Sequence, residues 1–416
     1  MLIGVVHKNS NFTLSKSKII RMLRNKAYLL TFILCFFILQ SACTQNKTDK
    51  ILPAAERFTQ YQSLLKNKKI AVVANQASLV GDNHLVDYLL EKKVNLLKIF
   101  SPEHGFRGHA DAGEKVKDGI DSKTNLPIVS LYGKHKKPYP EDFDGVDMVV
   151  FDLQDVGVRF YTYLSTLHYM MEACAENEIP LLVLDRPNPN AHYIDGPVLE
   201  SDCKSFVGLH PVPIVYGMSI GEYAKMINGE KWLKNGIQCN LTVIPCANWT
   251  RDIVYNMPIK PSPNLPNYQS IQLYPSLCFF EGTVVSAGRG TDFPFQTYGH
   301  PLISKGDFEF KPRSIAGASK NPKFKGQICK GEDLRKVNID HLRSRQQLDL
   351  SFLLKGYADL NKKTDFFNTF FEKLAGTKQL RQQIIKGKSE AEIRMSWHKK
   401  LNEFKIIRKK YLIYPN

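Results

Sequence analysis

The sequence predicts an α/β fold, in which a Rossmann-like parallel sheet with helices on both faces is followed by a smaller C-terminal α/β domain. Short apolar runs alternate with stretches of helical periodicity, which is typical of parallel strands buried on both faces. The chain has 416 residues, more than one hydrophobic core usually holds. Its 43% hydrophobic and 23% charged residues are ordinary for a globular protein and exclude general disorder.

The predicted elements follow one another regularly from residue 69 onward. Apolar runs rich in β-branched residues predict strands at 69–74, 94–100, 127–132, 146–152 and 179–185, and the stretches between them predict helices at 84–92 and 161–176. After residue 302 the pattern is weaker, with a strand expected within 331–340 and helices at 352–360, 365–374 and 391–410. We therefore expect a leader (1–52), a Rossmann-like domain (53–301) and a smaller C-terminal domain that covers its cleft (302–416).

The first 52 residues predict export. A basic stretch at 21–26 precedes an apolar run at 27–39 and the sequence Ser-Ala-Cys, which ends at Cys43. This run of about 13 residues is too short to span a membrane as a helix, which takes roughly 20. The ending resembles a bacterial lipobox with its leucine one place early, at Leu39. We expect a periplasmic protein, with lipid attachment at Cys43 as the means of membrane anchoring.

The charge distribution argues against nucleic acid as a partner. The net charge of +17 comes from the two ends of the chain, because residues 304–416 hold 26 basic and 12 acidic residues whereas 53–303 is slightly acidic. A nucleic-acid enzyme is usually basic around its site, and this middle region carries the motifs. The basic C-terminal part is either an ordinary solvated surface or a contact for an anionic polymer or a membrane.

Several common cofactor motifs are absent from the sequence. No glycine-rich dinucleotide motif, phosphate-binding loop, zinc-protease motif or Cys-x-x-Cys pair occurs. We therefore expect no cofactor and no metal. Six cysteines follow Cys43, and we expect buried thiols because a chain of this size folds without disulfides.

Polar residues follow the predicted strands at the edge where open parallel sheets bind ligands. Each of them is also a common helix cap or turn residue, so the alternative at every position is a local structural role. Their convergence on one edge nevertheless predicts a site. The residues are Asn75, Glu103 and His104, Asp152 and Asp155, and Asp185, Arg186 and Asn188.

Glu103 is the first candidate for acid catalysis. It stands at a predicted strand end, and a carboxyl group in a partly apolar cleft has a raised pKa because burial disfavours its charge. Such a group can protonate the leaving oxygen in glycoside hydrolysis. The alternative is a structural ion pair with Arg107.

A second segment has the composition of a sugar site. Asp155, Arg159 and Tyr161 follow the strand at 146–152, and sugar sites combine aromatic faces with carboxylate, amide and guanidinium groups. The alternative is a capped turn before the helix. Further along, Arg289 lies in a glycine-rich loop, where a guanidinium could hold a substrate carboxylate through two hydrogen bonds.

Glu172 lies within the predicted helix at 161–176. The apolar stripe of this helix runs through Leu164, Leu167, Met171 and Cys174, which leaves Glu172 on its flank. The helix also leads away from the strand ends. The pattern alone therefore favours a solvated or structural role.

Five motifs occur together in a fixed order along the chain. They are PEHGFRG at 102–108, DLQDVG with RFYTY at 152–163, DRPNP at 185–189, PSPN at 261–264, and EGT at 281–283 with GRGT at 288–291. Together they closely resemble the NamZ-type exo-β-N-acetylmuramidases, and the resemblance runs from about residue 69 to residue 414.

The resemblance implies a cleft between two domains and the release of N-acetylmuramic acid from non-reducing ends of peptidoglycan fragments. It implies glutamates as catalytic groups, with Glu103 first. Glu172 also matches a recurring Met-Glu-Ala helix of the family, so either the helix begins later than 161 or this glutamate serves packing. The lactyl carboxylate of the sugar requires a cation. Substrate-binding candidates are His104, Arg107, Asp155, Arg159, Tyr161, Arg186, Asn188 and Arg289.

A second hypothesis uses the same cleft without catalysis. An exported lipoprotein that binds muropeptides or sugars would also carry arginines and aromatic residues. Such a binder needs no proton donor, so a bell-shaped dependence of activity on pH separates the two hypotheses.

Overall fold

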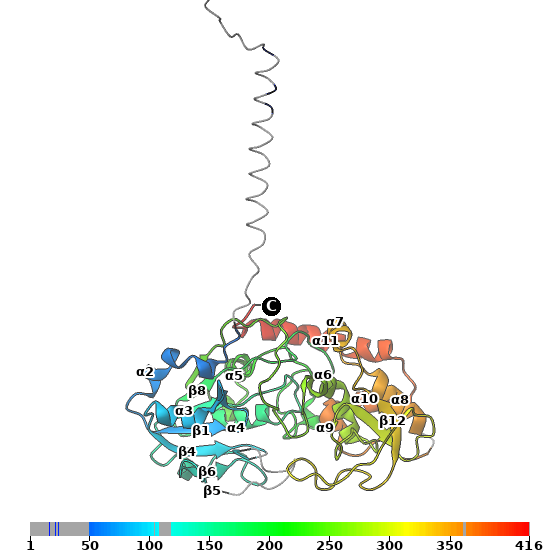
Figure 1. Cartoon of the computed structure of the whole chain (residues 1–416), viewed down its shortest axis with the longest axis horizontal. Coiled ribbons are helices and arrows are strands. Elements are labelled where there is room, and N and C mark those ends of the chain that lie inside the picture. The colour runs from blue at the N-terminus through cyan, green and yellow to red at the C-terminus, as the bar shows by residue number, and fades with distance from the viewer. Residues whose placement is uncertain are drawn as a thin grey trace, which may run out of the picture. The chain divides into compact units, whose positions relative to one another are not determined.

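The computed structural model contains a seven-stranded sheet, whose labelled strands lie at the left of Figure 1. All neighbouring strands pair in parallel except β5, which pairs antiparallel with β6 at one edge. In sheet order the strands are β5 (Gly119–Ile120), β6 (Pro127–Ser130), β4 (Leu96–Ser101), β1 (Ile70–Ala74), β7 (Met148–Asp152), β8 (Leu181–Leu184) and β9 (Leu241–Ile244).

Helices cover both faces of this sheet. Side chains alternate between the faces along a strand, so Val72 of β1 packs in one core with α3 (Leu85–Glu91). Its neighbour Val73 packs in the other core with α4 (Tyr163–Glu176) and α5 (Ile220–Gly229). The predicted α/β fold is therefore confirmed, with an antiparallel edge strand in addition.

The helix predicted at 161–176 begins two residues later than expected. Tyr161 and Thr162 belong to the turn that leads into α4. This difference places both side chains at the edge of the sheet and not on the helix.

The part of the chain after β9 builds a second, smaller sheet. Its order is β10 (Thr297–His300), β12 (Cys329–Asp333) and β11 (Phe308–Phe310), all antiparallel. β10 precedes the predicted domain boundary at 302 yet pairs with β12, which follows it. The division into domains at that residue stays a prediction. The helices of this part are α6 (Tyr268–Leu277), η6 (Cys278–Gly282), α7 (Ile339–Ser344), α8 (Ser351–Leu360), α9 (Phe371–Ala375), α10 (Gln379–Ile385) and α11 (Glu390–Lys409).

The structure describes residues 50–103, 105–107, 118–360 and 363–415, together with Lys16, Arg21 and Arg24. Within these ranges no helix is long and apolar enough to cross a membrane. The six cysteines after Cys43 are all buried as free thiols. The remaining short elements are η1 (Ala54–Glu56), η2 (Phe58–Gln60), α2 (Gln62–Leu65), β2 (Leu79–Val80), β3 (Asn83–His84), η3 (Pro140–Phe143), η4 (Ser201–Cys203) and η5 (Lys234–Gly236).

The chain end returns to the strand ends of the main sheet. The Tyr414 hydroxyl donates to Asp185 Oδ2 at 2.6 Å, just past β8. Arg251 donates to the Tyr414 carbonyl at 2.6 Å and pairs with the buried Glu222 at 2.5 Å. The sheet edge beside β8 is therefore covered by protein.

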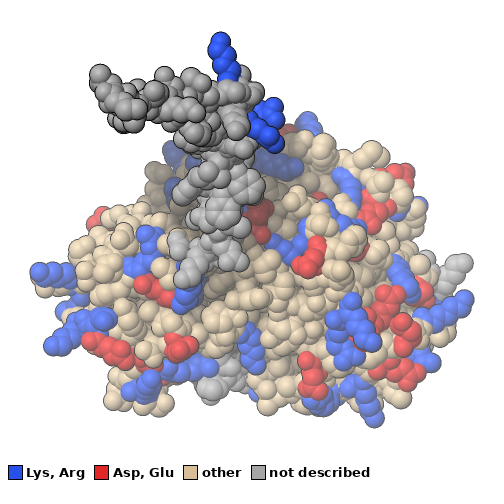
Figure 2. Space-filling model, turned by 45° about the horizontal axis from the view of Figure 1, so that its top comes forward, with Lys and Arg blue, Asp and Glu red and all other residues tan. Residues whose placement is uncertain are grey.

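Several basic residues of the C-terminal part pair with nearby acids. Lys355 and Lys388 pair with acids one helical turn away, and Lys400 pairs with Glu200 of the preceding part at 2.7 Å. Figure 2 shows basic and acidic side chains interspersed on the visible face. This mixture favours the ordinary solvated surface over a contact for an anionic polymer.

Candidate active site

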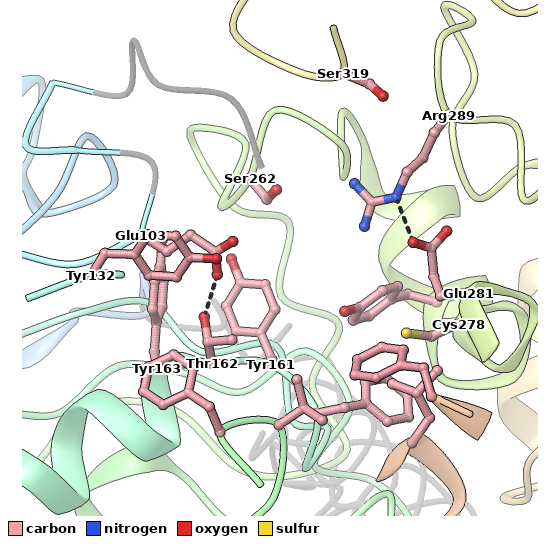
Figure 3. Close-up of a pocket in the computed structure, with 16 residues that line it drawn as sticks. Glu103, Tyr132, Tyr161, Thr162, Tyr163, Ser262, Cys278, Glu281, Arg289 and Ser319 are labelled. Atoms are coloured by element: carbon pink, nitrogen blue, oxygen red, sulfur yellow. Dashed lines mark hydrogen bonds and ion pairs between the residues drawn. The ribbon is translucent and has the colours of Figure 1, made fainter. Parts of the chain in front are cut away.

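A cavity of about 420 Å³ lies between the end of the main sheet and the segments that follow α5 (Figure 3). This volume is within the usual range for small-ligand sites. Acidic side chains lie on two sides of the cavity and aromatic side chains line much of it. The lining residues are Glu103, Tyr132, Phe160, Tyr161, Thr162, Tyr163, Phe206, Val207, Ser262, Tyr274, Cys278, Glu281, Arg289, Ser319, Phe370 and Leu374.

Glu103 lies two residues past the end of β4 and lines the cavity, half-buried. The Thr162 hydroxyl, from the turn before α4, donates to Glu103 Oε2 at 2.8 Å. Tyr132, which follows β6, also hydrogen-bonds Glu103. Burial together with the charge of Glu103 raises the pKa of Tyr132, so the phenol stays protonated and donates. Two side chains from different elements thus hold this carboxyl group at the cavity.

The opposite wall carries Glu281 and Arg289, as Figure 3 shows. Arg289 Nε lies 3.2 Å from Glu281 Oε2, and the guanidinium also lies over the Phe295 ring at 5.1 Å. Burial lowers the pKa of Arg289, but the charge of Glu281 outweighs it and the net shift is upward. This wall therefore presents a fixed cation beside a carboxylate.

Lys323 fixes the segment that carries Glu281. Its ammonium donates to the carbonyl oxygens of Phe280, Thr283 and Val285 at 2.8, 2.7 and 3.2 Å. Phe280 lies within η6, and Thr283 and Val285 follow it, at a helix end where backbone acceptors lack helical partners. One ammonium group therefore ties together three backbone carbonyls around Glu281.

The proline-rich segment at 261–266 lies beside the cavity. The Tyr161 hydroxyl donates to the Pro261 carbonyl at 2.9 Å, and Ser262 lines the cavity. Tyr161, predicted to bind substrate, thus reaches the cavity with its hydroxyl held by this segment.

Other predicted substrate-binding residues are buried and satisfied by protein. Arg186 forms a double ion pair with Asp152, with both N–O distances 2.7 Å, and Asn188 donates to the Met218 carbonyl. Neither residue lines the cavity. Their side chains are engaged with protein groups outside the cavity, and substrate binding by these two residues stays a prediction.

Asp155 and Arg159 are likewise structural in this geometry. Asp155 is fully buried and accepts from the Tyr216 hydroxyl and the Gly157 amide, and burial raises its pKa to about 6. Arg159 donates to the carbonyls of Pro197 and Val212, both at 2.8 Å, and of Leu374 in α9 at 2.9 Å. The alternative of a structural turn applies here, since both side chains hold backbone together.

Arg107 and Glu172 lie outside the cavity lining. Arg107 pairs with Asp121 at 2.7 Å. The alternative from the sequence had paired Arg107 with Glu103. Glu172 accepts from Lys137 and from the Lys234 amide, both at 2.7 Å. Burial raises the pKa of Glu172, but these hydrogen bonds outweigh it and the net shift is downward. Packing is the role that this geometry supports for Glu172.

Two predicted site residues, His104 and Cys43, lie outside the described residues. The described residues also contain no group of three or more side chains able to hold a metal ion.

The sequence pattern missed several residues that line the cavity. Thr162 was not predicted because it was assigned to a helix. Tyr132 was not predicted because it stands at the end of an ordinary predicted strand. Glu281 stood in a quoted motif, but its carboxylate had no assigned role. Phe370 lies in a region without a recognisable motif, and no signal in the sequence pointed to it.

Comparisons with known proteins cover nearly all of the chain after residue 69. The models of the N-terminal and C-terminal parts of exo-β-N-acetylmuramidase NamZ match residues 70–269 and 272–414. The chain is 41% identical over 389 residues to the peptidoglycan β-N-acetylmuramidase NamZ of Bacillus subtilis strain 168, which covers 89% of this chain and 91% of that protein.

Two solved structures of Bacteroides fragilis proteins, both described as DUF1343 family members, also match. One has a TM-score of 0.82 at 46% identity and the other 0.72 at 29% identity. Each match covers 88% of this chain, and it covers 100% and 99% of the respective solved chain.

Proposed function

The chain belongs to the exo-β-N-acetylmuramidase NamZ family, and we propose that it is an exo-acting glycoside hydrolase that releases N-acetylmuramic acid from non-reducing ends of peptidoglycan fragments. The observation that carries this proposal is the cavity with Glu103 on one wall and the Glu281–Arg289 pair on the other. Glycoside hydrolysis uses two carboxyl groups on either side of the scissile bond. A non-catalytic sugar binder, in contrast, needs no proton donor beside the scissile bond.

Glu103 is our candidate for the general acid. Its proton passes to the glycosidic oxygen while the bond from that oxygen to the anomeric carbon breaks. Water finally supplies the hydroxyl group to that carbon, and its remaining proton passes to an active-site carboxylate. Thr162 and Tyr132 orient the carboxyl group for this transfer. In the same scheme Glu281 is the second carboxylate, which stabilises the positive charge that develops on the sugar ring.

Arg289 is our candidate for recognition of the lactyl carboxylate. Of the four arginines considered from the sequence (Arg107, Arg159, Arg186 and Arg289), this one alone lines the cavity among the described residues. A guanidinium matches a carboxylate through two parallel hydrogen bonds. Arg289 would then separate N-acetylmuramic acid from sugars that lack the lactyl group.

The direct test is the Glu103→Gln variant with a disaccharide of N-acetylmuramic acid and N-acetylglucosamine. We expect wild-type protein to release both sugars, identified by mass, and the variant to lose about 10²–10⁴-fold in kcat with an unchanged melting temperature. Glu141→Gln, at an exposed residue outside the cavity, is the matched control. Equal turnover by Glu103→Gln and wild type would refute the assignment.

We also propose that the protein is exported to the periplasm and anchored by lipid on Cys43. The support is the leader sequence alone: the basic stretch, the apolar run and the cysteine that follows two small residues. Mass spectrometry of the mature N-terminus decides the matter. Acylated Cys43 as the first residue supports the anchor, and a mature chain that begins elsewhere contradicts it.

A further inference from the structure

Phe370 differs from the other aromatic residues that line the cavity. Six of the seven contact another aromatic ring, so their faces or edges are already engaged. Among the described residues, Phe370 contacts no other ring, and 39% of its surface is exposed. The six engaged residues are Tyr132, Phe160, Tyr161, Tyr163, Phe206 and Tyr274.

The backbone of Phe370 is held rigidly against the segment of Glu281. Asn368 Oδ1 accepts from the Phe370 amide at 2.8 Å, and the Asn368 amide donates to the Gly282 carbonyl at 3.0 Å. A Cβ atom on Gly282 would lie 2.5 Å from Phe371 Cα, so only glycine permits this close approach. The ring of Phe370 therefore starts from a backbone fixed relative to Glu281.

A second contact fixes the same segment to the main sheet. Arg159 donates to the Leu374 carbonyl of α9 at 2.9 Å, and Phe370 directly precedes this helix. The segment that carries Phe370 is thus bonded at both ends, through Asn368 and through Leu374. An exposed aromatic ring that is preorganised in this way binds a flat apolar surface at a low entropic cost.

We propose that Phe370 is the stacking platform for the pyranose ring of the leaving-group sugar, the residue that follows N-acetylmuramic acid in the glycan. The inference rests on the proposed function. An exo-acting enzyme takes the terminal sugar into the inner part of its cavity, and the rest of the glycan leaves through the mouth. Phe160 and Tyr163 are 3% and 1% exposed whereas Phe370 is 39% exposed, and from this difference we infer that Phe370 stands on the solvent side of the cavity.

The experiment compares two substrates of N-acetylmuramic acid. One carries N-acetylglucosamine as the leaving group, and the other carries methanol as a methyl β-glycoside, which offers no ring to stack. For Phe370→Ala we expect kcat/KM to fall about tenfold on the disaccharide, the equivalent of ~1.4 kcal/mol, and to change less than about twofold on the methyl glycoside. Phe370→Trp should retain activity on both, and Ile385→Ala, exposed and outside the cavity, serves as control.

Equal losses on the two substrates, or no loss on the disaccharide, would overturn the proposal. A binding measurement separates this inference from the proposed function. Calorimetry of the disaccharide with Glu103→Gln, with and without Phe370→Ala, should show about tenfold weaker binding in the double variant. If the wild type binds but hydrolyses nothing, the enzymatic function fails while this difference still tests the platform, and equal binding by both variants would overturn it.

Discussion

The strand ends of β4 and of β7 and β8 lie at the same edge of one sheet, yet they differ in what surrounds their acids. Past β4, Glu103 faces a cavity and is held by the hydroxyl groups of Thr162 and Tyr132. At the ends of β7 and β8, Asp152 and Asp185 are fully buried and bonded to protein groups. The comparison shows that a polar residue at a strand end becomes available to a ligand only where no other segment covers it.

The largest effect on stability is expected at the ends of β7 and β8, where protein segments cover the acids. Arg186→Met leaves the Asp152 carboxylate buried without its ion-pair partner, and we expect the free energy of unfolding to fall by about 3–5 kcal/mol. Urea denaturation measures this change. The double variant with Asp152→Asn should recover part of the loss. A stable Arg186→Met protein with an impaired KM would instead place Arg186 in substrate binding.

Asp155, which follows β7, makes the stability of the fold depend on pH. Burial raises its pKa from 3.8 to about 6, so between these values the folded protein holds a proton that the unfolded chain has lost. The stability from this group is complete below about pH 4 and is lost as the pH rises through 6. Between these pH values the free energy of unfolding of the wild type should fall by up to about 3 kcal/mol through this group, and the Asp155→Asn variant should lack this fall. Denaturation curves at pH 4, 5, 6 and 7 measure the difference, and parallel curves for variant and wild type would contradict the assignment.

The Arg289→Met variant tests the cavity through its preference between two substrates. Arg289→Met should lower kcat/KM on a chromogenic β-N-acetylmuraminide about 100-fold, because a carboxylate in the cavity loses its cation. The corresponding β-N-acetylglucosaminide lacks the lactyl carboxylate, and its slower hydrolysis should change little. An equal loss on both glycosides would assign Arg289 to the support of Glu281 and not to recognition.

The smallest effect is expected at Glu172. Because this side chain pairs with Lys137 and the Lys234 amide away from the cavity, Glu172→Gln should cost about 1–2 kcal/mol of stability and leave kcat unchanged. Steady-state kinetics with the disaccharide provide the check. A kcat reduced by orders of magnitude would restore Glu172 as a catalytic residue.

The sequence predicted the sheet well because its strands and helices follow local patterns. The apolar runs around Val72 and Val150 can be buried on both faces only within a layered fold, and the period of α4 follows from Leu164, Leu167 and Met171. Glu103 could be selected because its motif stands directly past a strand. The start of α4 was placed two residues early, and the hydroxyl groups of Tyr161 and Thr162 instead bond to Pro261 and Glu103, which are distant in the chain.

The candidate site was only partly predictable because its members are far apart in the chain. Glu103 and Glu281 come from different parts of the fold, and no local pattern indicates that Phe370 meets the segment of Gly282. The roles of Arg159 and Asp185 were likewise set by distant partners, Leu374 and Tyr414. Residues of the same type at similar strand ends therefore take different roles, because different segments pack on them.

By itself, the sequence determined the alternation of strands and helices, the edge of the sheet that carries polar groups and the resemblance to a family, because each depends on neighbouring residues. The tertiary structure decided which of those polar groups is open to a substrate. A buried carboxylate needs partners, and Asp152 and Asp185 find theirs in Arg186 and in the returning chain end, whereas Glu103 is left facing a cavity. That choice depends on long-range packing.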